Sequence, residues 1–504
     1  MATAQVFDKI CQSSLQIVEA FTYLIHRADN RHTSRRYSLT MAHGQTSDAA
    51  NWYSEVGGNQ PFACQLSTVT DIRTVCCEAK SRIKGRQIMK TFSFHTIAGL
   101  LAVGLVFGVN FAQAQAGTLD PNFGTDGTAT TIFTGAGSPV MLPIGAAQQA
   151  SGDIVVLSQF DFVSDEGTQI GLTRYTPAGK LDTTFGTKGS TITNFSSFTF
   201  DPFAFALEPN GKILVAGFVS GGNNFGLAQF TANGVLDTTF GTDGVASAVS
   251  GADFPNAFLL QPNGQILMGG FKDGGRHTPG SLSLVRFNSN GALDPTFGTA
   301  GIALVTPAQI AGPQALALLS NGDYLAVGGM SGKVLELSST GELLSTVTAG
   351  TLTASSPLAG LEPFPTIFES NGNYLVASLH CEGGSDCGGT DTKVQLFGET
   401  GVLNSGFSST PFGFGGFHNI PQALAVQSNG QVVVGDIVED TSGPNFGGIA
   451  RFDTNGELDT TFGSGGTVTV DNNVTALLID TNGDILAIEG TGNDGIVVAA
   501  YLAN

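Results

Sequence analysis

Short apolar runs, separated by Gly, Pro, Asn and Ser, fill the chain from residue 117 to its end. The last stretch shows the arrangement, with runs at residues 467–470, 475–480, 484–489 and 495–502 and an Asn-Gly pair at 482–483. An Asn-Gly pair between apolar runs predicts a tight hairpin, because a type I′ turn needs positive φ at both central residues. Gly and Pro interrupt every stretch long enough to form a helix. The pattern therefore predicts an all-β chain of short antiparallel strands.

These runs recur in seven units of about 55 residues, and a fixed motif marks each unit. The motif G-x-L-D-x-x-F-G-x-x-G ends at Gly127, Gly189, Gly244, Gly301 and Gly466, and degenerate copies of it end at Gly350 and Thr410. Hairpin turns recur at Ser151-Gly152 and at the Asn-Gly pairs that begin at Asn210, Asn263, Asn321, Asn371, Asn429 and Asn482. Four strands in each unit predict a seven-bladed β-propeller of four-stranded antiparallel blades over residues 117–504.

We place the motif at the link between the outer strand of one blade and the inner strand of the next. Its Leu and Phe are expected to pack between blades, its Asp to cap a tight turn, and its glycines to take positive φ. A ring of carboxylates is the alternative role for the Asp residues, but their fixed spacing to Phe-Gly favours capping. The first motif is expected to close the ring by packing beside the last blade, without a shared strand. The structural residues predicted in this way are Asp120, Phe123, Asp182, Phe185, Asp237, Phe240, Asp294, Phe297, Asp459 and Phe462.

Residues 89–116 read as a secretory signal. A basic residue precedes an uncharged apolar run at 97–111, and small residues alternate with Gln before expected cleavage after Ala114 or Ala116. The mature protein is then exported to the periplasm or released. Residues 1–88 share no pattern with the rest, so we interpret them as an unstructured extension or as a misassigned start ahead of Met89. The alternative is a cytoplasmic tail with residues 97–111 as an uncleaved anchor, although that run is short against the ~20 residues that span a bilayer.

The charge balance limits the partners. The chain carries 41 acidic and 21 basic side chains, for a net charge of −20, and only 12% of its residues are charged. A nucleic-acid binder needs clustered Lys and Arg to neutralise phosphates, so this composition excludes that class. The 69 glycines and 41% hydrophobic residues fit a large repeat core, not a disordered chain.

The motifs resemble a known family. The G-x-L-D-x-x-F-G-x-x-G motif, the Asn-Gly hairpins and strand ends such as Arg286-Phe287 and Arg451-Phe452 are similar to the delta-60 repeat family of bacterial propeller-like proteins. The resemblance covers residues 117–504 and is weakest where Val347 replaces the motif Phe and Ser408 replaces the following Gly. It implies a secreted bacterial propeller and brings no established activity, catalytic residue or cofactor.

Cysteine and histidine residues offer two candidate sites. Cys381 and Cys387 lie in one Gly-rich loop and, in an exported protein, are expected to form a disulfide. His277, His380 and His418 all fall in or beside links on one face, so a shared metal site is one interpretation. They belong to three different units, which favours the alternative of no metal and no cofactor.

Catalytic motifs are missing from the sequence. There is no G-x-S-x-G, H-E-x-x-H, phosphate-loop or dinucleotide-binding pattern. The acidic pairs Asp165-Glu166 and Glu439-Asp440 fit solvated loop charge better than a glycosidase-like pair. Residues 480–484 match the hairpin turns of other units and lack the Gly and Glu of a calcium loop. The alternative is a propeller enzyme, a hydrolase or lyase with a carboxylate or metal site over the central channel.

Phenylalanines collect in the links that differ from unit to unit. These rings either plug the channel and cover blade edges or form a contact surface, since binding residues usually lie on uneven loops of a rigid scaffold. We therefore expect a monomeric, secreted, non-catalytic binding module with a protein or glycan partner; a structural cell-surface protein is a second alternative. The candidate contact residues are Phe198, Phe200, Phe203, Phe412, Phe414, Phe417 and His418.

Overall fold

The computed structural model describes four short segments between residues 51 and 90, and residues 115–503 with gaps. The gaps are 134–139, 162–167, 196–197, 220–223, 250–253, 273–279, 307–312, 329–332, 349–364, 370–371, 381–388, 401, 408, 442 and 492–494. The chain divides into two compact units, Met1–Phe111 and Ala112–Asn504. No helix in the described part is long and apolar enough to cross a membrane.

The first unit contains two hairpins in its described part. One pairs β1 (Asn51–Glu55) with β2 (Pro61–Gln65), and the other pairs β3 (Ala79–Ile83) with β4 (Arg86–Lys90). The apolar run at 97–111, on which the signal prediction depends, lies outside the described residues.

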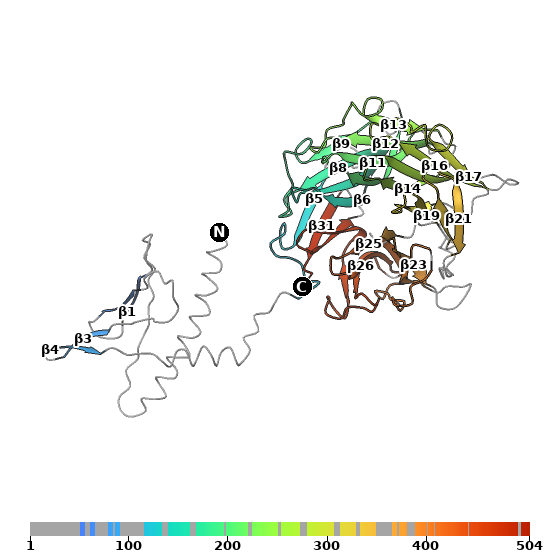
Figure 1. Cartoon of the computed structure of the whole chain (residues 1–504). Coiled ribbons are helices and arrows are strands. Elements are labelled where there is room, and N and C mark those ends of the chain that lie inside the picture. Colours follow the sequence, from blue (N-terminus) through green and yellow to red (C-terminus); the bar gives the residue numbers. More distant parts are fainter. Residues whose placement is uncertain are drawn as a thin grey trace. The chain divides into compact units, whose positions relative to one another are not determined.

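In the second unit, seven antiparallel sheets stand around a central axis, as Figure 1 shows. Blade one holds β6 (Val140–Gln148), β7 (Ile154–Asp161), β8 (Thr168–Tyr175) and β9 (Ser190–Thr193). Blade two holds β10 (Phe200–Leu207), β11 (Ile213–Val219), β12 (Asn224–Phe230) and β13 (Val245–Ala248). Blade three holds β14 (Phe254–Leu260), β15 (Ile266–Lys272), β16 (Ser281–Phe287) and β17 (Ile302–Val305). Blade four holds β18 (Pro313–Leu318), β19 (Tyr324–Gly328), β20 (Lys333–Leu337) and β21 (Leu343–Thr348).

The remaining three blades complete the ring. Blade five holds β22 (Thr366–Phe368), β23 (Tyr374–His380) and β24 (Asp391–Phe397), three strands in its described part. Blade six holds β25 (His418–Val426), β26 (Val432–Glu439), β27 (Phe446–Phe452) and β28 (Thr467–Val470). Blade seven holds β29 (Asn473–Ile479), β30 (Ile485–Gly490) and β31 (Gly495–Tyr501), with β5 (Thr128–Ile132) as its fourth strand. The seven-bladed, all-β prediction is confirmed.

Two details of the predicted connectivity are wrong. The motif lies between the third and fourth strands of one blade, because β28 follows the motif and pairs with β27 instead of opening blade seven. For the same reason, the first motif delivers β5 to the edge of β31, where Thr128 pairs with Ala499 and Ile132 with Gly495. The ring is therefore closed by a shared strand and not by packing alone.

The motif Phe is the wedge that joins neighbouring blades. Phe240 of blade two is 2% exposed and packs on Gly291 of blade three, where an added Cβ would lie 3.0 Å from the ring. The next residue, Gly241, has a φ of 53° and donates its N–H to the carbonyl of Asn290 in blade three. A side chain is excluded at this position because its Cβ would lie 2.2 Å from the carbonyl oxygen of Val245. The same arrangement recurs at Phe123, Phe185, Phe297 and Phe462.

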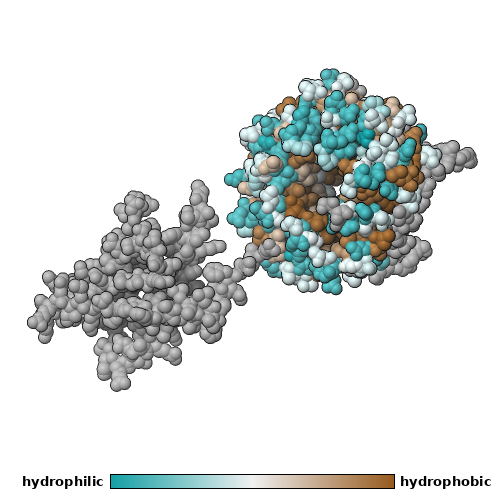
Figure 2. Space-filling view, in the orientation of Figure 1, coloured by the Kyte–Doolittle hydropathy of each residue, from teal (hydrophilic) through white to brown (hydrophobic). Residues whose placement is uncertain are grey.

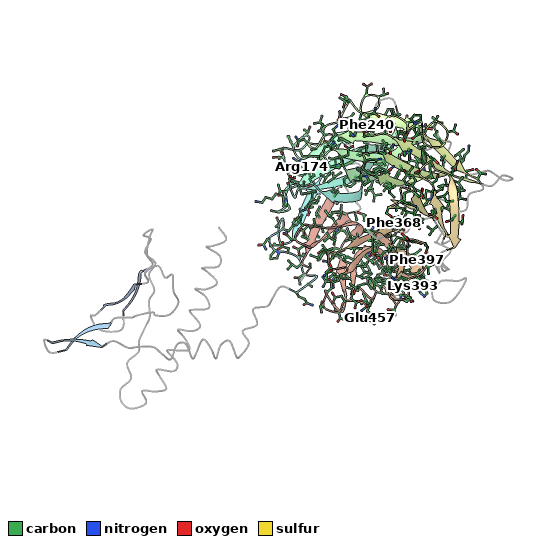
Figure 3. All side chains as sticks on the ribbon, viewed as in Figure 1. Arg174, Phe240, Phe368, Lys393, Phe397 and Glu457 are labelled. Atoms are coloured by element: carbon green, nitrogen blue, oxygen red, sulfur yellow. The ribbon has the colours of Figure 1, made fainter. Side chains whose placement is uncertain are left out.

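The motif Asp caps its turn and holds an Arg on the preceding strand in three blades. In blade one, Asp182 accepts the backbone N–H of Thr184 and pairs with Arg174 at 2.7 Å. The guanidinium of Arg174 lies 4.8 Å from the ring centre of Phe185 and donates to the carbonyl of Ala232 in blade two. Figure 3 labels Arg174 in the ring of blades. Arg286 with Asp294 and Arg451 with Asp459 repeat this cluster in blades three and six.

The junction between blades four and five lacks these features. Blade four places Glu336 where blade three has Arg286, and its β21 begins directly after the turn, without the motif loop. In blade three, Arg286 donates to the hydroxyl of Tyr324, whereas the corresponding hydroxyl of Tyr374 is buried with no partner in the described part. Apolar packing of Leu325 and Val327 of blade four with Tyr374 and Val376 of blade five holds this junction.

Candidate binding surface at the variable face

The two ends of the ring differ in chemistry. The hairpin turns between first and second strands and the motif links between third and fourth strands share one end, which we call the turn face. Its hairpin turns recur from unit to unit and are closed locally; Asn210, for example, accepts the N–H of Lys212. Its motif links are regular except in blades four and five. The links between second and third strands and between blades share the other end, the variable face, as the sequence predicted. The variable face is the candidate binding surface, because binding residues usually lie on uneven loops of a rigid scaffold.

The predicted phenylalanines of blade two divide into core and surface. Phe200 is fully buried, and an added Cβ on Gly217 would lie 2.4 Å from its ring. Phe198 is half-buried and stacks on Phe195 at 4.9 Å, and both line a groove of about 780 Å³ beside β13. Phe203 is half-buried against the edge of Phe218 at 5.8 Å. Phe200 thus supports the surface without belonging to it.

The predicted phenylalanines beside blade six divide in the same way. Phe412 is buried, packs on Phe452 at 5.0 Å and forms a bridge with Thr392, so it covers the edge of β24 where a fourth strand of blade five was expected. Phe414 is half-buried and occupies the space left by Gly448. Phe417 is 40% exposed and meets His418 edge-on at 4.4 Å. Of this group, Phe417 offers the largest accessible apolar surface.

A hydrogen-bond network fixes the segment that carries Phe417. The backbone N–H of Thr390 donates to the carbonyl of Phe417, and the hydroxyl of Thr390 lies 3.2 Å from Nδ1 of His418. The side chain of Asn419 donates to the carbonyl of Thr390 and accepts the N–H of Phe414. This exposed aromatic edge is therefore held on a rigid base, which limits the entropy lost when it is contacted.

A buried carboxyl lies beneath this edge and was missed by the sequence analysis. Asp436 of β26 is 0% exposed, and its Oδ2 accepts the hydroxyl of Thr392 at 2.6 Å across the junction of blades five and six. Its other oxygen has no partner in the described part. Burial raises the pKa of Asp436 to about 7, and the Thr392 hydrogen bond opposes this. A neutral carboxyl group is the form that suits this site.

A second buried carboxyl occupies the same strand position in blade seven. Glu489 of β30 is 4% exposed and accepts the side-chain N–H of Asn472 at 3.1 Å. Burial, followed by the nearby charge of Asp471, raises its pKa to about 7. At this position the other blades have the small residues Ser158, Gly217, Gly270, Gly328 and Ser378. A carboxylate among apolar strand residues at a register otherwise filled by Gly or Ser is the signal that could have revealed both.

The structure describes only some of the candidate metal and disulfide residues. His277, Cys381 and Cys387 lie outside the described residues. His380 ends β23, and His418 begins β25. Within the described part, no group of three His, Cys, Asp or Glu side chains is placed to hold a metal. The carboxylate of Asp480 accepts the N–H groups of Asn482 and Asp484, which is a turn cap.

Comparison with known proteins supports a propeller-repeat family. A family model described as a domain of unknown function (DUF5122) beta-propeller matches residues 149–185, 208–240, 261–297 and 427–462. Each matched segment runs from near a hairpin turn to the motif Phe in blades one, two, three and six. A comparison with curated proteins finds no match.

Several solved structures are similar to this chain at low sequence identity. A streptogramin B lyase is similar at 10% identity over 73% of this chain and 97% of its own, with a TM-score of 0.42. A catalytically inactive virginiamycin B lyase from Staphylococcus aureus with quinupristin is similar at 11% identity over 74% and 98%, with a TM-score of 0.42. A puromycin hydrolase is similar at 12% identity over 91% of this chain and 58% of its own, with a TM-score of 0.37. Scores this low carry no argument about activity.

Proposed function

We propose that this chain is an exported, non-catalytic binding module of the delta-60 repeat kind, which recognises its partner through the variable face. The observation that carries this proposal is the exposed ring of Phe417 on the rigid base formed by Thr390, His418 and Asn419. An exposed aromatic side chain held by a hydrogen-bonded framework is typical of a contact residue. Phe198, Phe203, Phe414 and His418 complete the proposed surface, while Phe200 and Phe412 support it from the core.

The test is the capture of a partner on the full chain before and after Phe417→Ser. The control is Val235→Ser, because Val235 is 59% exposed on the turn face and so removes a comparable apolar group at the opposite end. We expect Phe417→Ser to reduce capture of a specific envelope or medium component with an unchanged melting temperature, and Val235→Ser to leave capture intact. Equal capture by both variants would contradict the proposed surface.

Of the two predicted cleavage sites, the packing that begins at Gln115 supports the one after Ala114. The side chain of Gln115 donates to the carbonyl of Gly463, and the carbonyl of the next residue, Ala116, accepts the N–H of Gly463. Ala116 is buried in the junction of blades six and seven. Cleavage after Ala114 keeps these contacts, whereas cleavage after Ala116 removes them. We therefore propose Gln115 as the mature N-terminus, and mass spectrometry of the native protein tests this.

A propeller enzyme is the second candidate, because Asp436 and Glu489 have the raised pKa values expected of general acids. Both carboxyl groups are sealed from solvent, so a substrate reaches neither without a change in the blade junctions. Turnover by the purified chain that is abolished by Asp436→Asn or Glu489→Gln, at unchanged stability, would favour this candidate. A purely structural surface protein would show neither turnover nor Phe417-dependent capture.

A further inference from the structure

Residues 412–417 form a short segment that covers the buried carboxyl of Asp436. Asp436 of β26 pairs with Gly448 of β27, and cross-strand partners project on the same face of the sheet. The ring of Phe414 occupies the place that a side chain at Gly448 would take, so it lies beside Asp436 on that face. Phe412 is buried and meets Phe414 edge-on at 5.7 Å. We call residues 412–417 the lid.

Thr392 of β24 connects the lid to the carboxyl. Its backbone N–H donates to the carbonyl of Phe412, and its carbonyl accepts the N–H of Phe412. Its hydroxyl donates to Oδ2 of Asp436 at 2.6 Å. A change in the state of Asp436 therefore reaches, through Thr392, the residue at which the lid begins.

Glycines separate the rings of the lid and allow it to move. Gly413, Gly415 and Gly416 stand between its Phe residues, and Gly415 has a φ of 86° with nothing within 4 Å of an added Cβ. Hydrophobic residues already reach the surface around the central hollow of the ring (Figure 2), so lifting the lid exposes apolar area of a kind that this surface carries. The lid can therefore lift without the loss of a strand.

The closed lid suits a neutral carboxyl group and not an ionised one. Asp436 is 0% exposed, its Oδ2 has one donor, and its Oδ1 has no partner in the described part. An ionised carboxylate needs more donors, and water supplies them once the lid has lifted. Burial raises the pKa of Asp436 to about 7, whereas hydration in the open state restores the ordinary value of about 3.9.

Uncharged residues surround the Asp436 side chain. Its partners on β25 and β27 are Pro421 and Gly448. Lys393 follows Thr392 on β24 and so projects from the opposite face. Within the described part, no neighbouring charge contributes to the raised pKa of Asp436. The charged or titratable groups on the packed strands lie toward their ends: His380, Asp391, His418 and Glu439 at the variable face, and Arg451 beside Asp459.

We propose that ionisation of Asp436 releases the lid, so that the partner surface at Phe417 is formed in acid and is lost as pH rises toward neutrality. This proposal rests on the proposed function, because Phe417 ends the lid, and it adds the regulation of that surface. The closed state favours the protonated carboxyl and the open state the ionised one. The equilibrium constant for opening therefore rises up to about tenfold per pH unit between about pH 4 and 7 and levels off above.

The test is hydrogen–deuterium exchange of the full chain between about pH 5 and 8, read by mass spectrometry of its peptides. The N–H groups of Phe412, Phe414 and Phe417 are hydrogen-bonded in the closed lid and report its opening. The reference is Asp436→Asn, which keeps an acceptor but cannot ionise. The ratio of rates in the two proteins at each pH cancels the pH dependence of exchange itself. We expect this ratio to rise up to about tenfold per unit until about pH 7.

Two further measurements keep the test specific. The N–H of Gly241, bonded to the carbonyl of Asn290 between blades two and three, is the matched control, and its ratio should stay constant with pH. The second variant, Phe414→Ala, uncovers the carboxyl, so water reaches Asp436 in the closed state. Exchange at Phe412 and Phe417 should then lose most of its dependence on the ionisation of Asp436.

Two exchange results would overturn the proposal. One is a lid ratio that does not change with pH, and the other is an equal change at Gly241, which would report unfolding of the whole propeller. Partner capture by the natural chain should be weaker at about pH 8 than at about pH 5, and Asp436→Asn should retain it at both. Equal capture by the natural chain at both pH values, with its dependence on Phe417 intact, would reject the regulation alone. Capture that does not depend on Phe417 would reject the proposed function and leave the pH-dependent lid.

Discussion

The hydroxyl of Thr392 in blade five donates a 2.6 Å hydrogen bond to the carboxyl of Asp436 in blade six. The acceptor oxygen is satisfied, but the second oxygen of Asp436 has no partner in the described part of the chain. A neutral carboxyl group tolerates this burial, whereas an ionised one would leave an uncompensated charge between two blades. The junction between blades five and six is therefore sensitive to the protonation of a single group.

The stability of the propeller should fall as pH rises through neutrality. Burial raises the pKa of Asp436 to about 7, well above the value of about 3.9 in the unfolded chain. Between these two pKa values, Asp436 is protonated in the folded state and ionised in the unfolded state. Its contribution to the free energy of unfolding is therefore complete below about pH 4 and is lost as pH rises through about 7. Glu489, with its pKa raised to about 7, acts in the same direction. Urea unfolding across this range measures the effect.

The double variant Asp436→Asn/Glu489→Gln provides the control for this pH dependence. Neither amide titrates, so the variant should show a nearly flat free energy of unfolding between about pH 5 and 8, where the natural chain declines. An equally steep decline in the variant would assign the pH dependence to other groups. Each single variant should remove part of the slope.

Replacing Phe240 by Ala should lower the free energy of unfolding by about 3–5 kcal/mol. The ring is almost fully buried between blades two and three and rests on Gly291, so its loss leaves a cavity that the backbone cannot fill. Denaturant unfolding gives the value, and Phe417→Ser serves as the exposed reference, with a change below about 0.5 kcal/mol. Similar losses in both variants would mean that Phe240 is not a wedge.

The number of blades could be predicted from the sequence because each Asn-Gly turn marks one hairpin. The position of the motif within a blade could not, since a cyclic repeat looks the same whether Phe240 links two strands of one blade or two blades. That ambiguity explains why the pairing of β5 with β31 was missed. Blade five departs from the repeat because an irregular segment ending at Phe412 covers β24. Asp436 was missed because a strand pattern alone does not show which junction a side chain enters.

Arg451→Ala should destabilise the fold by about 3–5 kcal/mol, the range for breaking a buried ion pair. Its guanidinium pairs with Asp459 at 2.8 Å and donates to the carbonyl of Ala503 across the junction of blades six and seven. Without the guanidinium, the carboxylate of Asp459 and the carbonyl of Ala503 each lose a hydrogen-bond donor. The double variant Arg451→Met/Asp459→Leu removes the charges together and should recover part of the loss. A double variant no more stable than Arg451→Ala would show that packing, and not the unpaired carboxylate, causes the destabilisation.

The junction of blades four and five should open before the others. It lacks the motif Phe and the buried Arg, and the hydroxyl of Tyr374 has no partner there in the described part. Val376→Cys places a thiol in this junction, and Met268→Cys places one at the same strand position between blades two and three. The thiol at position 376 should be labelled about tenfold faster or more. A difference of about 1.4 kcal/mol in the free energy of local opening gives that ratio. Both natural side chains are buried, so intrinsic exposure does not favour either site. Equal labelling rates, with each thiol assigned by peptide mapping, would show that apolar packing alone holds this junction as firmly as the Phe240 wedge holds the junction of blades two and three.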